Sequence, residues 1–227
     1  MVAGNASVGD IISCTASATD SSGNVSTDTT SVSVDNSIPT ASVLSLQSDG
    51  SNPTIAHTND SLLVQVSSSD ADGDTVQYEY SWEVDGAVVF TDGPTTAATS
   101  TLDGSLYFAR DQHVVVHVTP TDGIDTGTAV ASSVFTISNS APTAPQISLT
   151  PSAPEETDDL VCMATGSTDL DSGDTITYSY EWTQNGNARS DLSGQSTVLS
   201  SETSPSDVWE CVATASDGTD GATTSLS

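Results

Sequence analysis

The residues best suited to chemistry are carboxylates gathered in two short loops. The first loop contains Asp70, Asp72 and Asp74, and the second contains Asp169, Asp171 and Asp174. Alternating carboxylates in a loop tightened by Gly73 can direct several oxygens at one hard cation, and Ca²⁺ is the cation that takes such ligands. The same spacing is also ordinary Asp-Gly turn chemistry. The sequence therefore leaves two interpretations open, a calcium site or a solvated turn.

A second pair of acidic turns follows later along the chain. Asp122 and Asp125 flank one glycine turn, and Asp217 and Asp220 flank the other. Each turn could lie at the same pole as the preceding acidic loop or at a domain junction. An EF-hand is excluded, because the distal bidentate Glu of that motif is missing.

Other catalytic chemistry finds little support. Neither a nucleophile motif nor a phosphate loop is present, and no carboxylate lies in an apolar stretch that would raise its pKa. His113 and His117 are too far apart along an extended strand to bind one metal, since strands rise about 3.3 Å per residue. The sequence favours a protein that is not an enzyme.

Aromatic residues at even spacing form the next group of candidates. They are Tyr78, Tyr80 and Trp82 in one segment and Tyr178, Tyr180 and Trp182 in another. One face of a strand would carry each trio, which could stack on sugars. Packing in a sandwich core is the preferred interpretation for Trp82 and Trp182, and the alternation around Trp209 favours the core as well.

Charge restricts the partners. The chain has two basic against 31 acidic residues and a formal net charge of −29. Nucleic acid and anionic membranes require Lys or Arg, so direct binding to either is not expected. No apolar run approaches the length of about 20 residues that a membrane helix needs, so insertion in a membrane is not expected either.

The segments that must position these residues repeat with a period of about 100 residues. Matching segments are 36–42 with 139–145, 68–86 with 167–186, and 114–127 with both 208–221 and 11–23. We therefore predict a partial domain over 1–35 that holds only the last two strands, a complete domain over 36–138, and a domain over 139–227 whose last strand is truncated. A window on a longer array would have this organisation, and so would a subunit completed by strands of a neighbouring copy.

The repeat alignment also predicts a disulfide. Alternating strands place Val64 and Val116 of the middle repeat where Cys162 and Cys211 stand in the last repeat. A covalent pair and an apolar pair at the same core position indicate a bridge between the second and sixth strands of a sandwich. Cys14 occupies the position of Cys211 and is expected to be unpaired.

Segment 68–86, SSDADGDTVQYEYSWEVDG, resembles the signature of polycystic kidney disease (PKD) type and related bacterial immunoglobulin-like domains. The resemblance implies an all-β fold of tandem immunoglobulin-like (PKD-like) β-sandwich domains arranged end to end. It also implies a secreted or surface module that serves as a spacer, an adhesive or a carbohydrate-associated domain, in some members with calcium in the acidic loop.

Together these observations predict a structural or adhesive component of an extracellular stalk or filament on a bacterial surface. Its partners would be other copies of itself or other surface proteins. The alternative is a carbohydrate- or protein-binding accessory module of a larger secreted enzyme. A third explanation treats the acidity as halophilic adaptation, with stability that rises with monovalent salt and ignores calcium.

Overall fold

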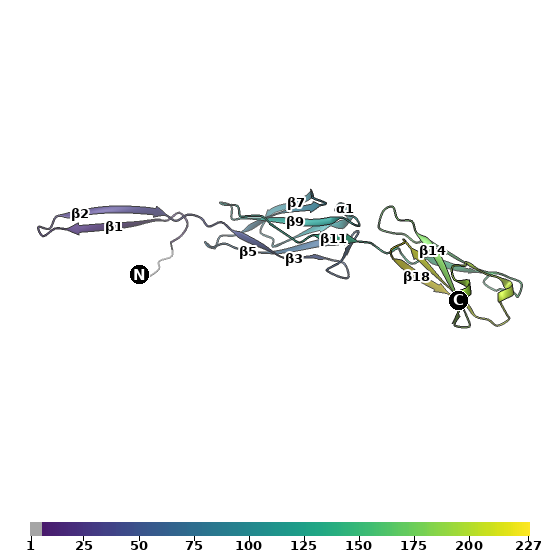
Figure 1. Cartoon of the computed structure of the whole chain (residues 1–227). Helices are drawn as coiled ribbons and strands as arrows, with labels where there is room; N and C mark the ends of the chain where they lie inside the picture. The colour runs from purple at the N-terminus through teal and green to yellow at the C-terminus, as the bar shows by residue number, and fades with distance from the viewer. Residues whose placement is uncertain (1–5) are drawn as a thin grey trace. The chain divides into compact units, whose positions relative to one another are not determined.

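The computed structural model describes residues 6–227, which form mostly β-strands (Figure 1). These residues divide into two compact units. The first unit comprises the described residues up to Thr54 with Ser61–Asp103 and His113–Phe135. The second comprises two loops of the middle repeat, Ile55–Asp60 and Gly104–Gln112, with Thr136–Ser227. Each acidic loop thus belongs to a different unit.

The elements are almost all strands. Those of the first unit are β1 (Ile11–Thr19), β2 (Val25–Ser33), β3 (Thr40–Ser48), β5 (Ser61–Ser69), β6 (Gln77–Val84), β7 (Ala87–Thr95), β8 (Thr99–Asp103), β9 (His113–Thr121) and β10 (Val130–Ala131). The second unit holds β4 (Ala56–His57), α1 (Gly104–Tyr107), β11 (Phe135–Ser138, from Thr136 onward), β12 (Gln146–Thr150), β13 (Leu160–Thr165), β14 (Thr177–Gln184), β15 (Asn187–Ala188), η1 (Ser190–Leu192), β16 (Thr197–Val198), η2 (Ser200–Glu202), β17 (Trp209–Ser216) and β18 (Gly221–Leu226). The predicted all-β fold is confirmed.

Two antiparallel sheets enclose the core of the first unit. One has the order β3-β5-β8, and in the other β6 lies between β7 and β9 while β10 pairs with β9. Side chains alternate between core and solvent, so Val64 and Val116 are completely buried. The indole of Trp82 is also buried and donates to Ser100 Oγ of the opposite sheet at 3.2 Å.

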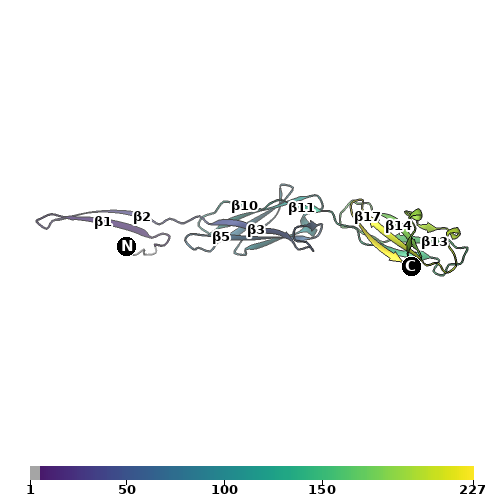
Figure 2. The ribbon, with the colours of Figure 1, turned by 60° about the horizontal axis from the view of Figure 1, so that its bottom comes forward.

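The core of the second unit has the same plan with a covalent link. Sheet β12-β13-β16 faces sheet β15-β14-β17-β18, and Figure 2 labels β13, β14 and β17 of these sheets. Cys162 on β13 and Cys211 on β17 form the predicted disulfide, next to the buried Trp182. Within the same unit, β4 pairs in parallel with β11.

The strands β1 and β2 form a two-stranded antiparallel ribbon. All of their residues are exposed, including the free cysteine Cys14. Hydroxyl pairs such as Ser13 with Ser31 cross the ribbon at 2.9 Å. Among the described residues, no helix is long and apolar enough to span a membrane.

Candidate functional site

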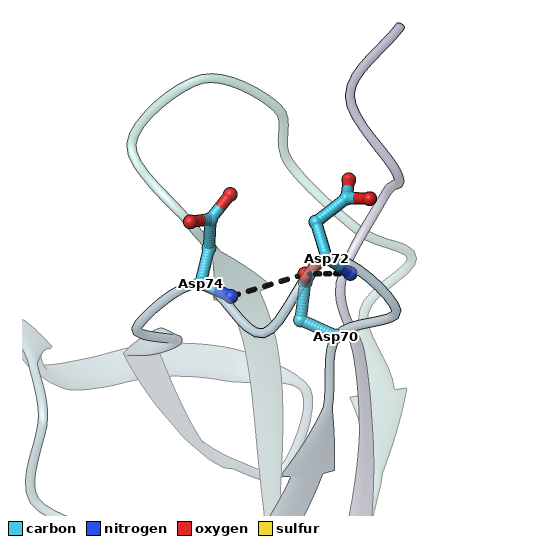
Figure 3. A group of neighbouring side chains, drawn as sticks. All are labelled: Asp70, Asp72 and Asp74. Carbon is cyan, nitrogen blue, oxygen red and sulfur yellow. Dashed lines mark hydrogen bonds between the residues drawn. The ribbon is translucent and has the colours of Figure 1, made fainter. Parts of the chain in front are cut away.

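The first acidic loop follows β5 and is organised by one carboxylate. Asp70 Oδ1 accepts hydrogen bonds from the backbone N–H groups of Asp72, Gly73 and Asp74 at 2.9, 3.1 and 3.3 Å. Gly73 permits this fold-back because its φ is +84°. Figure 3 shows that the side chains of Asp72 and Asp74 consequently point to the same side of the loop. Carboxylate oxygens of the three aspartates lie within 4.8 Å of one another.

The second acidic loop follows β13 and uses its carboxylates differently. Asp169 Oδ1 accepts from the backbone N–H of Asp171 at 2.8 Å, which is the same type of turn. The Asp171 side chain, however, is buried and accepts from Ser140 N at 2.6 Å and from Thr58 Oγ1. The group with oxygens within 4.8 Å is therefore Asp169, Asp174 and Asp217, without Asp171.

An asparagine at the start of each matched repeat binds the later acidic turn of that repeat. Asn36 Nδ2 donates to Asp122 Oδ2 at 2.8 Å and to Asp125 Oδ2 at 2.9 Å. In the last repeat, Asn139 Nδ2 donates to Asp217 Oδ2 at 2.9 Å and to Asp220 Oδ2 at 3.0 Å. Sequence reasoning did not single out either asparagine, although Asn-Ser opens the matched segments 36–42 and 139–145.

These contacts affect the acidity of the turn carboxylates. The hydrogen bond from Asn36 is the main cause that lowers the pKa of Asp122, with further backbone donors in the same turn. Asn139 is likewise the main cause of the lowered pKa of Asp217. A hydrogen bond to the charged form of a carboxyl group favours that form, so both groups stay ionised at neutral pH.

Several oxygens of these segments are buried without a hydrogen-bond donor. They are Asn36 Oδ1, Asp70 Oδ2 and Asp169 Oδ2. Burying an unpaired polar atom is unfavourable, and an oxygen is rarely left in that state. Because carbonyl and carboxylate oxygens are the ligands of hard cations, the donor chemistry of these segments fits Ca²⁺.

Arg110 reaches the second acidic loop from the loop Gly104–Gln112 of the same unit. Its guanidinium binds both oxygens of Asp174, with Nη2 at 2.8 Å from Oδ1 and Nη1 on Oδ2. Nη1 also donates to Asn139 Oδ1 at 2.7 Å. These contacts place one positive charge directly in a cluster of carboxylates.

The aromatic candidates lie inside the two units. Trp82 and Trp182 are buried, and the Trp182 indole donates to the carbonyl of Gln195 at 2.8 Å. Trp209 is also buried and packs edge-to-face on Trp182 with ring centroids 6.2 Å apart. Among residues 6–227, every Trp, Tyr and Phe side chain is buried or half-buried. Trp82, Trp182 and Trp209 therefore lie in the cores, whereas Tyr178 and Tyr180 are half-buried.

The comparisons with known proteins are limited to structure. No family model matches the chain, the PKD type included, and no curated protein matches it. A calcium-stabilised adhesin with which an Antarctic bacterium binds ice is 17% identical over 95% of this chain and 55% of its own, with a TM-score of 0.39. This chain thus spans about half the length of that structure.

Two further solved structures show a similar degree of likeness. A two-domain fibronectin type III segment of chicken tenascin is 10% identical over 81% of this chain and 98% of its own, with a TM-score of 0.39. Part of a 1.5-MDa bacterial ice-binding adhesin is 17% identical over 95% of this chain and 72% of its own, with a TM-score of 0.37.

Proposed function

We propose that this chain is a structural segment of an extracellular stalk, filament or adhesin built from tandem immunoglobulin-like sandwiches. Its first acidic loop, with Asp70, Asp72 and Asp74, binds Ca²⁺, and hydrogen bonds to Asp72 and Asp171 secure the points at which two repeats begin. The protein is not an enzyme in this proposal, and its partners are further repeats, other copies of itself or other surface proteins.

The observation that carries the proposal is the same hydrogen bond at the start of two repeats. Asp72 Oδ2 accepts from Ser37 N at 2.6 Å, and Asp171 Oδ2 accepts from Ser140 N at 2.6 Å. The asparagine before each serine holds the later acidic turn. The entering chain is thus bound to both acidic segments of its own repeat, which suits a module that must hold its ends under load.

In the proposal, Ca²⁺ binds the same loop and strengthens its contact with the entering chain. Asp70, Asp72 and Asp74 bring their oxygens together, and Asp70 Oδ2 is buried without a hydrogen-bond donor. A divalent cation would offset the repulsion between these carboxylates, whose oxygens lie within 4.8 Å of one another and carry the same charge sign. Asp72 would then link the cation to the entering chain through Ser37.

The proposed extracellular location is supported by the Cys162–Cys211 bond, because disulfides persist mainly in oxidising environments. The alternative, an accessory module that binds carbohydrate, needs an accessible aromatic surface. Every described aromatic side chain is buried or half-buried. The structural role is therefore better supported than the accessory-module role.

Calcium binding by the full chain tests the cation component of the proposal. We expect Ca²⁺ to raise the midpoint of thermal unfolding, since a ligand at about 100 times its Kd stabilises the folded state by about 2.7 kcal/mol. The double variant Asp72→Asn/Asp74→Asn should lose the response of the first unit. The double variant Glu79→Gln/Glu181→Gln removes the same charge from exposed strand positions and should keep it. An equal response of all three proteins would contradict the assignment.

Binding to a panel of oligosaccharides tests the structural role against the accessory-module alternative. We expect no saturable binding, because the three tryptophans are buried and the described tyrosine and phenylalanine side chains are buried or half-buried. Saturable binding of one sugar that survives the loop substitutions would establish the alternative.

A further inference from the structure

The same tight turn precedes the late strand of every repeat. The three turns are 7–10, 109–112 and 204–207, and we call them the pre-strand turns. In each turn the third residue has a positive φ, +82° at Gly9, +68° at Asp111 and +73° at Ser206. The fourth residue donates its N–H to the carbonyl of the first, at 3.0, 3.3 and 3.1 Å respectively. The three turns share this geometry, and each precedes a strand of the matched segments 11–23, 114–127 and 208–221.

The side chain of the fourth residue makes the same contact in all three turns. Asp10, Gln112 and Asp207 each accept a hydrogen bond from the backbone N–H of the first turn residue, at 2.8, 2.8 and 2.9 Å. The second position is the one that differs in chemistry. It is Val8 in the first turn, Arg110 in the second and Pro205 in the third.

In the second unit, the residue at the second position of the turn places a positive charge at the acidic loop. Arg110 binds Asp174 through two hydrogen bonds and lies 3.9 Å from Asp171 Oδ2. Its backbone N–H donates to Thr58 Oγ1 at 3.2 Å, and Thr58 in turn donates to Asp171. The guanidinium thus places a positive charge on both Asp174 oxygens, and a metal ion at the group of Asp169, Asp174 and Asp217 would have to compete with it.

In the first unit the same position brings no charge. Val8 lines a surface hollow with Ala6, Ser7, Ala71, Asp72 and Asp74. The side-chain carbonyls of Asn36 and Asn139 differ in whether they have a hydrogen-bond donor. Asn139 Oδ1 accepts from Arg110 at 2.7 Å, whereas the equivalent Asn36 Oδ1 is buried without a donor. The first unit thus lacks a positive group at the place where the second unit has a guanidinium.

We infer that Arg110 is a built-in cation that replaces a divalent metal ion at the second acidic loop. The residue at the second position of the pre-strand turn decides whether the facing loop depends on metal. A guanidinium attached to the chain is present at any calcium concentration, and its planar fork suits a carboxylate. The loop that Val8 faces depends on free Ca²⁺ instead. This inference rests on the proposed cation binding by the first loop.

Calcium titration by isothermal calorimetry tests the inference. It is carried out on the full chain and on variants that remove the cation at position 110 or add one at position 8. Wild type should bind Ca²⁺ at the first loop only. Arg110→Met should add a second binding event, because it frees Asp174 and Asn139 Oδ1. Val8→Arg should weaken binding at the first loop at least tenfold. Arg189→Met is the matched control, because Arg189 carries the same charge but pairs with Asp191 and Glu202.

The outcomes separate this inference from the proposed function. If wild type binds no Ca²⁺, the proposed cation binding is wrong and the inference fails with it. If wild type binds Ca²⁺ but neither Arg110→Met nor Val8→Arg changes the number or affinity of the sites, only the role of the turn residue is overturned. Should Arg110→Met fail to fold, Val8→Arg decides alone, because Val8 is 37% exposed and tolerates a larger side chain.

Discussion

At the scale of single residues, two asparagines and one arginine decide how the carboxylates are used. Asn36 and Asn139 each hold a pair of turn aspartates, and Arg110 holds Asp174. A carboxylate that accepts such a bond contributes to stability only while it is ionised.

We predict an acid sensitivity that depends on Asn139. The pKa of Asp217 in the folded chain lies below its ordinary value of 3.8, mainly because Asn139 donates to it. A lowered folded pKa means that the stabilisation is present above pH 3.8 and is lost as the pH falls through the folded value. Urea unfolding of Asn139→Ala should therefore show a lower free energy of unfolding than wild type at neutral pH.

The difference between Asn139→Ala and wild type should shrink as the pH falls below about 4. Asn187→Ala is the control, since Asn187 is exposed on the short strand β15 and contacts no carboxylate in the hydrogen bonds described. A constant difference between Asn139→Ala and wild type at every pH would contradict the prediction.

At the scale of elements, the two units solve the same packing problem with different side chains. Val64 on β5 and Val116 on β9 are both buried in the first unit, while a disulfide joins β13 and β17 in the second. The ribbon β1-β2 has no such partner among the described residues, and all of its side chains are exposed. Isolated two-stranded ribbons are at best marginally stable, so this ribbon is the weakest element of the chain.

We predict that the disulfide supplies much of the stability of the second unit. It closes a loop with a sequence separation of 49 residues, for which the chain-entropy relation suggests about 4 kcal/mol. The variant Cys162→Val/Cys211→Val copies the pair of the first unit. Its free energy of unfolding, measured in guanidinium chloride, should fall by up to about 4 kcal/mol, less what the added apolar packing recovers.

Cys14→Ser serves as the control for the disulfide variant, and its stability should stay within about 0.5 kcal/mol of wild type because Cys14 is exposed and unpaired. Equal stability of the oxidised and reduced protein would show that the bond contributes nothing.

At the scale of the whole molecule, the net charge of −29 opposes the compact state. We predict that, in a chelator, NaCl raises the midpoint of thermal unfolding, because screening shortens the range of repulsion from about 10 Å at 0.1 M to about 3 Å at 1 M. Millimolar CaCl₂ should raise the midpoint beyond what NaCl of equal ionic strength achieves. If Ca²⁺ adds nothing at equal ionic strength, halophilic adaptation explains the acidity.

Local patterns in the sequence determined the fold class and most of the core. The period of the repeats and the alternation along each strand placed Trp82, Trp182 and Trp209 inside. Aligned positions predicted the bond between Cys162 and Cys211. These features were predictable because side chains along a strand point alternately to opposite faces, so residue spacing alone assigns a side chain to the core or to solvent.

Only the tertiary structure decided how the acidic groups are used. Asn36 and Asp122 are 86 residues apart, Arg110 and Asp174 are 64 apart, and Thr58 and Asp171 are 113 apart. Asp169, Asp171 and Asp174 read as one set in the sequence, yet Asp171 is buried by Ser140 and Thr58 while Asp217 takes its place in the group. Such contacts depend on which loops meet at one end of a sandwich, and no spacing within a single segment carries that information.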